Sequence, residues 1–227
     1  MEILDDIPIR LDVEQVLKEL HLNERREQFE VVNKLIEIAN SIVRPKAIYK
    51  MSYVDNKNED TVDIGGIKFA SRVLRVNLDK VGKVFPYIMT IGNKLEDRMT
   101  SFDNLLEQYY LDEIGNVALG LIGNYLEEHL KREYRMGQIS SMYPGMGDLQ
   151  DWPIAQQEQL FSLFGNVEEL IGVRLTPSLL MIPRKSESGI YFPTEVEFLS
   201  CQICSREKCK DRQAPYDKDL AKSYRSR

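Results

Sequence analysis

A chain of 227 residues with 43% hydrophobic and 29% charged residues has the composition of a globular protein, which excludes a mainly disordered chain. Its net charge of −6 argues against nucleic acid as a partner, because a nucleic-acid binder needs a basic surface to neutralise phosphates. The apolar runs are far shorter than the roughly 20 residues of a membrane-spanning helix, and the acidic N-terminus is unlike a signal peptide, so we expect a cytoplasmic protein with no membrane partner.

Two helices are predicted before residue 45. Apolar residues at helical spacing follow Asp12, whose carboxylate can accept from the free amides of a helix start, and they predict a helix over residues 13–20. A longer apolar stripe predicts a second helix over residues 29–43. Pro45 lacks an amide hydrogen and clashes with the preceding turn, so the second helix ends before it.

Strands are predicted after the second helix. The pattern becomes β-like from residue 47 to residue 85, with a turn at Gly65–Gly66. A further strand is predicted over residues 84–91, and Gly92 marks its exit toward a helical segment that begins near Lys94. The apolar residues assigned to the first group of strands include Val73, Leu74 and Val76.

Residues 104–134 carry the longest helical pattern, with apolar side chains on one face. Three glycines interrupt it, and each weakens a helix by up to about 1 kcal/mol relative to alanine. We interpret Gly115, Gly120 and Gly123 as positions where another backbone packs closely; a bound ligand is the alternative.

The remaining elements follow residue 137. We expect a loop rich in Ser, Gly and Pro, then a helix that Asp151 and Pro153 open and that extends to Phe164. Asn166 and Gly172 suit the two ends of a second short helix. Strands are predicted over residues 179–182, 190–192 and 196–199. A solvated polar tail is expected at the C-terminus, with the basic residues Lys218, Lys222, Arg225 and Arg227.

These elements predict an α+β fold, a twisted antiparallel sheet with packed helices, in which the long helix lies against the sheet. We divide the chain into N-terminal helices and first strands (1–103), a core segment (104–200), and a cysteine cluster with the C-terminal tail (201–227). We expect the three segments to form one domain.

Two motifs point to a function. The first reads Tyr143-Pro-Gly-Met-Gly-Asp148, where the glycines let the backbone turn sharply and approach a ligand. The second reads Leu175-Thr-Pro-Ser-Leu-Leu-Met-Ile-Pro-Arg-Lys-Ser-Glu-Ser-Gly-Ile-Tyr-Phe192. Their order, with a helix between them, resembles the activation (reactivation) domain of cobalamin-dependent methionine synthase, over residues 104–203.

The resemblance implies a binding site for S-adenosylmethionine. In that family the Pro-Gly loop and later strands line a cleft for this ligand, so the two motifs are expected to face each other across one crevice. The implied loop residues are Tyr143, Pro144, Gly145 and Met146, and the implied strand residues are Lys185, Ser186, Ser188, Gly189 and Tyr191.

The chain departs from the family pattern at the loop. The family has an arginine three residues before the proline, where a guanidinium can pair with the ligand carboxylate, and this chain has Ser141 there. Lys185 or Arg135 is the candidate replacement cation. Met146 and Phe198 stand where the family has tyrosines.

All three cysteines of the chain lie within nine residues, as Cys201, Cys204 and Cys209. Closely spaced cysteines in a cytoplasmic protein favour metal or redox chemistry over structural disulfides. Three thiolates could hold an iron–sulfur cluster with another fourth ligand, or a zinc ion completed by His21 or His129. The spacing does not choose between iron–sulfur, zinc and no metal.

The resemblance implies an accessory protein for the reductive reactivation of a corrinoid-dependent (cobalamin-dependent) methyltransferase. Such a protein docks on the corrinoid protein. A separate donor protein supplies the corrinoid with an electron, and S-adenosylmethionine supplies the methyl group. The cobalt does the chemistry, and no side chain here is a candidate general acid or base. Two alternatives stay open: an iron–sulfur electron-transfer protein that reduces a corrinoid, and a zinc-stabilised, non-catalytic interaction module.

Overall fold

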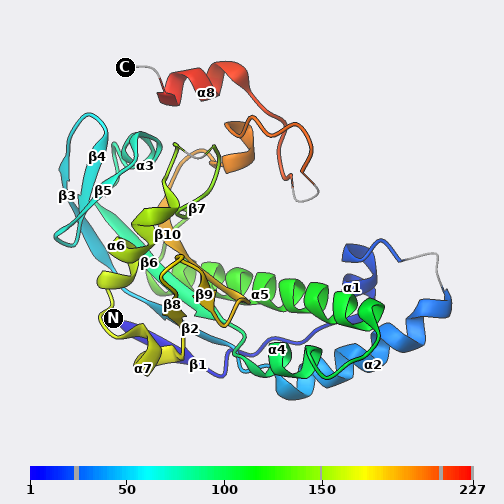
Figure 1. Ribbon diagram of the computed structural model, residues 1–227. Helices are drawn as coiled ribbons and strands as arrows, with labels where there is room; N and C mark the ends of the chain where they lie inside the picture. The colour runs from blue at the N-terminus through cyan, green and yellow to red at the C-terminus, as the bar shows by residue number, and fades with distance from the viewer. Residues whose placement is uncertain (23–25, 149, 210–211, 226–227) are drawn as a thin grey trace.

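Residues 1–22, 26–148, 150–209 and 212–225 are described by a computed structural model of the chain. Figure 1 shows an arch: helix α5 and the helices beneath it form one arm, and strands β3–β5 with the C-terminal region form the other. A curled antiparallel sheet with packed helices connects the two arms. The predicted α+β fold class is therefore confirmed.

Among the described residues, an 8-stranded antiparallel sheet is built around β6, which pairs with β2, β3 and β10. β1 pairs with β2, β4 and β5 continue from β3, and β7 pairs with β10. The separate hairpin of β8 and β9 is a 2-stranded sheet. The strands are β1 (Glu2–Asp5), β2 (Lys46–Tyr49), β3 (Ser52–Lys57), β4 (Thr61–Ile64), β5 (Ile67–Ala70), β6 (Lys83–Thr90), β7 (Ile139–Met142), β8 (Arg174–Leu175), β9 (Met181–Ile182) and β10 (Ser186–Pro193).

The predicted helix ends at Asp12 and Gly172 are confirmed, whereas Asp151, predicted to open a helix, caps none: it accepts from the Asp148 amide and from Arg225. The Asp12 carboxylate accepts from the Gln15 amide at 3.1 Å, and Gly172 ends α7 in the left-handed conformation. None of the described helices is both long and apolar enough to cross a bilayer. The helices are α1 (Val13–Glu19), α2 (Arg26–Ile42), α3 (Arg72–Asn77), α4 (Lys94–Met99), α5 (Leu105–Glu133), α6 (Gln157–Ser162), α7 (Val167–Ile171) and α8 (Lys218–Arg225), with 3₁₀ turns at Ile154–Gln156 and Ser200–Gln202.

The sheet separates two hydrophobic cores. One core packs α1, α2 and α5 against one face of the sheet, and it contains Tyr87 and Tyr191. The other core packs α3, α6, α7 and α8 against the opposite face, and it contains Ile88 and Ile190. Neighbouring residues of β6 and β10 enter different cores because successive side chains of a strand point to opposite faces. Alternation along β10 therefore decides which of its side chains face α5.

Two predicted strand segments are wrong. Val73, Leu74 and Val76 lie in helix α3, because the Ser71 hydroxyl caps it by accepting from the Leu74 amide at 3.0 Å. Residues 196–199 form no strand. The Phe198 amide there donates to the Ser140 side chain at 2.9 Å, so a side chain rather than a neighbouring strand satisfies it.

Two segments expected to be irregular are ordered elements. Residues 139–142, placed in a loop by their serines, form β7 against β10. The tail expected to be solvated forms α8, in which Ala221 is buried and the Tyr224 hydroxyl donates to Asn77 Oδ1 at 3.0 Å. Of the basic residues assigned to that tail, Arg227 lies outside the described residues.

The three glycines of α5 do not contact another backbone as interpreted from the sequence. A Cβ at Gly115 would lie 3.0 Å from Leu95 Cδ2 and 3.2 Å from Lys185 Cε, so side chains pack there. A Cβ at Gly123 would lie 3.4 Å from Met89 Cε. Gly120 is exposed, and nothing lies within 4 Å of its Cβ position. Tight packing therefore explains Gly115 but not Gly120.

Gly120→Ala is expected to stabilise the protein by up to about 1 kcal/mol, because alanine is a better helix former and meets no neighbour. The melting temperature should rise by about 2–4 °C for a chain of this size. Gly115→Ala is the matched control on the same helix, and its gain should be lost to the contacts with Leu95 and Lys185. Equal melting temperatures for the two variants would contradict this difference in packing.

Candidate functional site

The two sequence motifs meet at the edge between β7 and β10. Met142 pairs with Ile190 and Ser141 pairs with Tyr191, so the loop that starts at Tyr143 leaves the sheet beside Gly189. A Cβ at Gly189 would stand only 2.7 Å from the Met142 carbonyl oxygen. The absence of a side chain at Gly189 therefore lets the two motifs lie side by side.

The loop after β7 is held by its own backbone. The Gly145 amide donates to the Trp152 carbonyl at 2.7 Å, and the Met146 amide donates to the Tyr143 carbonyl at 3.2 Å. Gly145 has a φ of +89°, a conformation that L side chains rarely adopt. Pro144 and Met146 are buried, while Tyr143 is 40% exposed. Tyr143 is therefore the loop side chain that a ligand could contact, and Met146 anchors the loop.

Strand β10 divides its predicted site residues between the two faces of the sheet. The Ser186 hydroxyl contacts Thr90 Oγ1 at 2.9 Å and the Pro183 carbonyl at 2.7 Å, and Ser188 is also buried. Both serines alternate with Glu187 and Tyr191, which point to the α5 side. The serines thus support the strand, and the surface beside Tyr143 presents Glu187.

Glu187 lies among three tyrosines. Its Oε1 accepts from the Tyr87 hydroxyl at 2.6 Å. Tyr87 and Tyr191 stack with ring centroids 4.5 Å apart, and the Tyr191 hydroxyl donates to the Gly123 carbonyl at 3.3 Å. Burial raises the pKa of Tyr143, and the charge of Glu187 raises it further, which places the two side chains close together.

Burial also governs the acidity of this cluster. It raises the pKa of Glu187, while the hydrogen bond from Tyr87 lowers that pKa. Burial and the Glu187 charge both raise the pKa of Tyr87 and Tyr191. The tyrosines therefore stay protonated at neutral pH and can donate hydrogen bonds.

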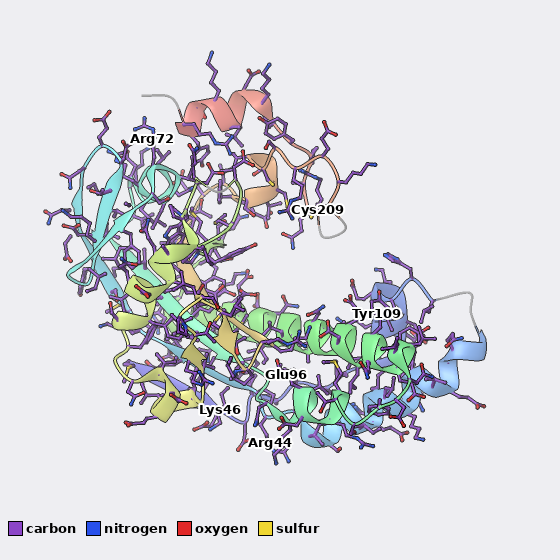
Figure 2. All side chains as sticks on the ribbon, viewed as in Figure 1. Arg44, Lys46, Arg72, Glu96, Tyr109 and Cys209 are labelled. Atoms are coloured by element: carbon purple, nitrogen blue, oxygen red, sulfur yellow. The ribbon has the colours of Figure 1, made fainter. Side chains whose placement is uncertain are left out.

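The cysteine segment lies over the Tyr143 loop. The Cys204 thiol contacts the Gly147 carbonyl at 3.8 Å, and the Ser205 amide donates to the Asp148 carboxylate at 3.1 Å. Figure 2 shows Cys209 on one side of the open concave face and Tyr109, on α5, on the other. The segment thus braces the loop from the C-terminal arm.

The predicted metal site has no support from this geometry. Cys201, Cys204 and Cys209 are free thiols, and no three His, Cys, Asp or Glu side chains gather at one point in the part of the chain that the structure describes. His129 instead lies 2.9 Å from the Tyr49 hydroxyl through its Nε2 atom. His21 follows the end of α1.

The candidate replacement cations are not directed at the cluster. Lys185 Nζ forms an ion pair with Asp112 at 2.9 Å and donates to Asn116 Oδ1 at 2.7 Å, both on α5. Arg135 is exposed just beyond the C-terminal end of α5. Lys185 therefore fastens the start of β10 to the helix.

Sequence reasoning missed Glu187 and Tyr87. The alternation of Ser-Glu-Ser within a strand would have placed Glu187 opposite the serines. Tyr87 has no such signal, because it reaches Glu187 only through the pairing of β6 with β10, in which Gly189 lies opposite Tyr87.

Comparison with known proteins identifies the fold. No protein-family model matches the sequence, and no curated protein matches it. A solved structure, the MetH reactivation domain bound to AdoHcy, is similar over 88% of this chain and 81% of its own, with a TM-score of 0.58 and 15% sequence identity. At this identity the similarity establishes the fold, which is the one that the sequence resemblance implies.

Proposed function

We propose that this protein serves the reductive reactivation of a corrinoid-dependent methyltransferase and binds S-adenosylmethionine as methyl donor on the surface of Tyr143 and β10. One observation carries the proposal: the fold brings the Pro-Gly loop and the Ser-Gly strand into contact, beside a tyrosine-lined carboxylate. A structure of the same fold binds AdoHcy, the product that S-adenosylmethionine leaves after methyl transfer.

The proposed reaction takes place on cobalt carried by the partner. A low-potential donor protein supplies one electron to the inactive cobalt(II) form. The reduced corrinoid would supply the electron pair that accepts the methyl group from the sulfonium, and S-adenosylhomocysteine would be the leaving product. This chain would orient the methyl donor and exclude water, which is the usual protein contribution when a cofactor carries the chemistry.

Binding is tested by titration calorimetry of S-adenosylmethionine into the full chain. Tyr143→Ala should weaken binding about tenfold, because it removes the exposed ring of the loop and such aromatic anchors contribute a large share of binding energy. Tyr53→Ala is the matched control, since Tyr53 is 55% exposed on β3 and lies outside this cluster. If the unaltered protein shows no heat of binding, or if both variants lose the same affinity, S-adenosylmethionine is removed from the proposal.

The methyl-transfer half is tested with free cobalamin reduced by titanium(III) citrate. The protein should accelerate formation of S-adenosylhomocysteine over the same mixture without protein. If the rate of S-adenosylhomocysteine formation is unchanged, the protein only binds S-adenosylmethionine and does not promote methyl transfer, even when calorimetry detects binding.

A further inference from the structure

Within the residues that the structure describes, Glu187 is a carboxylate without a cationic partner. Its Oε1 accepts from Tyr87 at 2.6 Å, and among the described residues it takes part in none of the ion pairs. Burial disfavours its charge. A carboxylate kept in such a place without a counterion is costly unless something binds to it, and such groups mark functional sites.

The nearest basic side chains in sequence are held elsewhere. Lys185 is paired with Asp112 at 2.9 Å, and Arg184 contacts Asp112 and Glu96 at 3.5 and 3.7 Å. Ser141, which pairs with Tyr191 across the strands, is uncharged. In the described part of the chain, then, no basic side chain pairs with Glu187, and a ligand or a partner can supply the cation.

The surroundings suit a small organic cation. The exposed ring of Tyr143 presents an electron-rich surface, which attracts positive charge. Tyr87 and Tyr191 are buried and stack on each other beneath Glu187. Helix α5 borders the cluster at Gly123, whose carbonyl accepts from Tyr191 at 3.3 Å. One turn earlier, Gly120 is exposed and no atom lies within 4 Å of its Cβ position.

We propose that Glu187, which the buried Tyr87 hydroxyl holds in place, and the exposed Tyr143 form a subsite for the sulfonium cation of S-adenosylmethionine. This inference rests on the proposed function and deepens it: the site recognises the positive charge of the methyl donor. S-Adenosylhomocysteine has the same adenosyl and amino-acid groups but lacks the charged sulfonium. The site therefore holds the donor more tightly than the product and favours product release after methyl transfer.

The test is calorimetry with both ligands on the full chain and on Glu187→Gln. The unaltered protein should bind S-adenosylmethionine about tenfold more tightly than S-adenosylhomocysteine, as a desolvated cation–carboxylate and cation–π contact allows. Glu187→Gln should make the two affinities equal, because it weakens the binding of S-adenosylmethionine and leaves the binding of S-adenosylhomocysteine unchanged. Glu127→Gln is the control, because Glu127 also raises the pKa of Tyr191 but is paired with Lys131 at 2.6 Å; its ratio should be unchanged.

Folding of the variant is measured in parallel. Because burial raises the pKa of Glu187, its ionisation costs stability as the pH rises above the unfolded-state value, and glutamine removes that cost at pH 7. Glu187→Gln should therefore melt no lower than the unaltered protein. A tenfold ratio that survives Glu187→Gln, or equal affinities for both ligands in the unaltered protein, overturns the sulfonium subsite and leaves the proposed function standing. Binding of neither ligand overturns both.

Discussion

Gly189→Ala is expected to lower the free energy of unfolding by about 3 kcal/mol, the upper part of the range for overpacked sites. The new Cβ would stand 2.7 Å from the Met142 carbonyl oxygen, 2.8 Å from the Tyr87 hydroxyl and 3.0 Å from Tyr87 Cε1. The carbonyl belongs to the backbone of β7, so relief requires β7 and β10 to separate. The melting temperature should fall by about 6–12 °C in a thermal scan.

Gly82→Ala is the matched control for this prediction. Gly82 is also close to the sheet, but nothing lies within 4 Å of its Cβ position. Its alanine variant should stay within about 0.5 kcal/mol of the unaltered protein. If both variants melt at the same temperature, the contact between β7, β10 and Tyr87 is looser than the structure describes.

Arg225→Ala is expected to cost about 3 kcal/mol, measured by urea unfolding. Arg225 Nε and Nη2 donate to the two Asp151 oxygens at 2.8 and 2.7 Å, and Nη2 also donates to the Ile203 carbonyl at 2.6 Å. Asp151 is only 3% exposed. Alanine would leave its carboxylate buried with one remaining hydrogen bond, from the Asp148 amide at 2.8 Å.

Two further variants separate this bond from a general effect on α8. Lys222→Ala, on the exposed side of the same helix, should change stability by less than about 0.5 kcal/mol. Arg225→Lys should destabilise the protein less than Arg225→Ala does, because an ammonium keeps the charge but not the paired geometry. A cavity of about 740 Å³ adjoins this contact, lined in part by Ser71, Asp151 and Tyr224. Equal stabilities of the Lys222 and Arg225 alanine variants would show that α8 does not depend on this ion pair.

Local sequence signals predicted most helices of this chain. Asp12, Asn166 and Gly172 marked helix ends that the structure confirms, because capping depends on a few neighbouring residues. The long pattern of residues 104–134 became α5 for the same reason. The segment around Val73 and Leu74 was misassigned, because β-branched and apolar residues suit a strand locally while the Ser71 cap and burial favour a helix.

Elements that depend on distant partners were missed. The serines of β7 carry no strand pattern, and the strand exists because β10 supplies its hydrogen bonds from about fifty residues away. The polar helix α8 was expected to be solvated, because Asp151, which binds Arg225, lies 74 residues earlier.

The sequence alone determined the fold class and the long helix, because these rest on periodicity and capping. It also determined the two motifs, Tyr143–Asp148 and the Ser-Gly strand, through their resemblance to the methionine synthase activation domain. Only the tertiary structure decided which side chains share the surface beside Tyr143. Antiparallel pairing brings the Tyr87 hydroxyl to 2.6 Å from Glu187 Oε1, although the two residues are 100 positions apart in the sequence. It also turns Ser186 and Ser188 to the other face of the sheet. Such pairing depends on the register of the whole sheet, which no local pattern records.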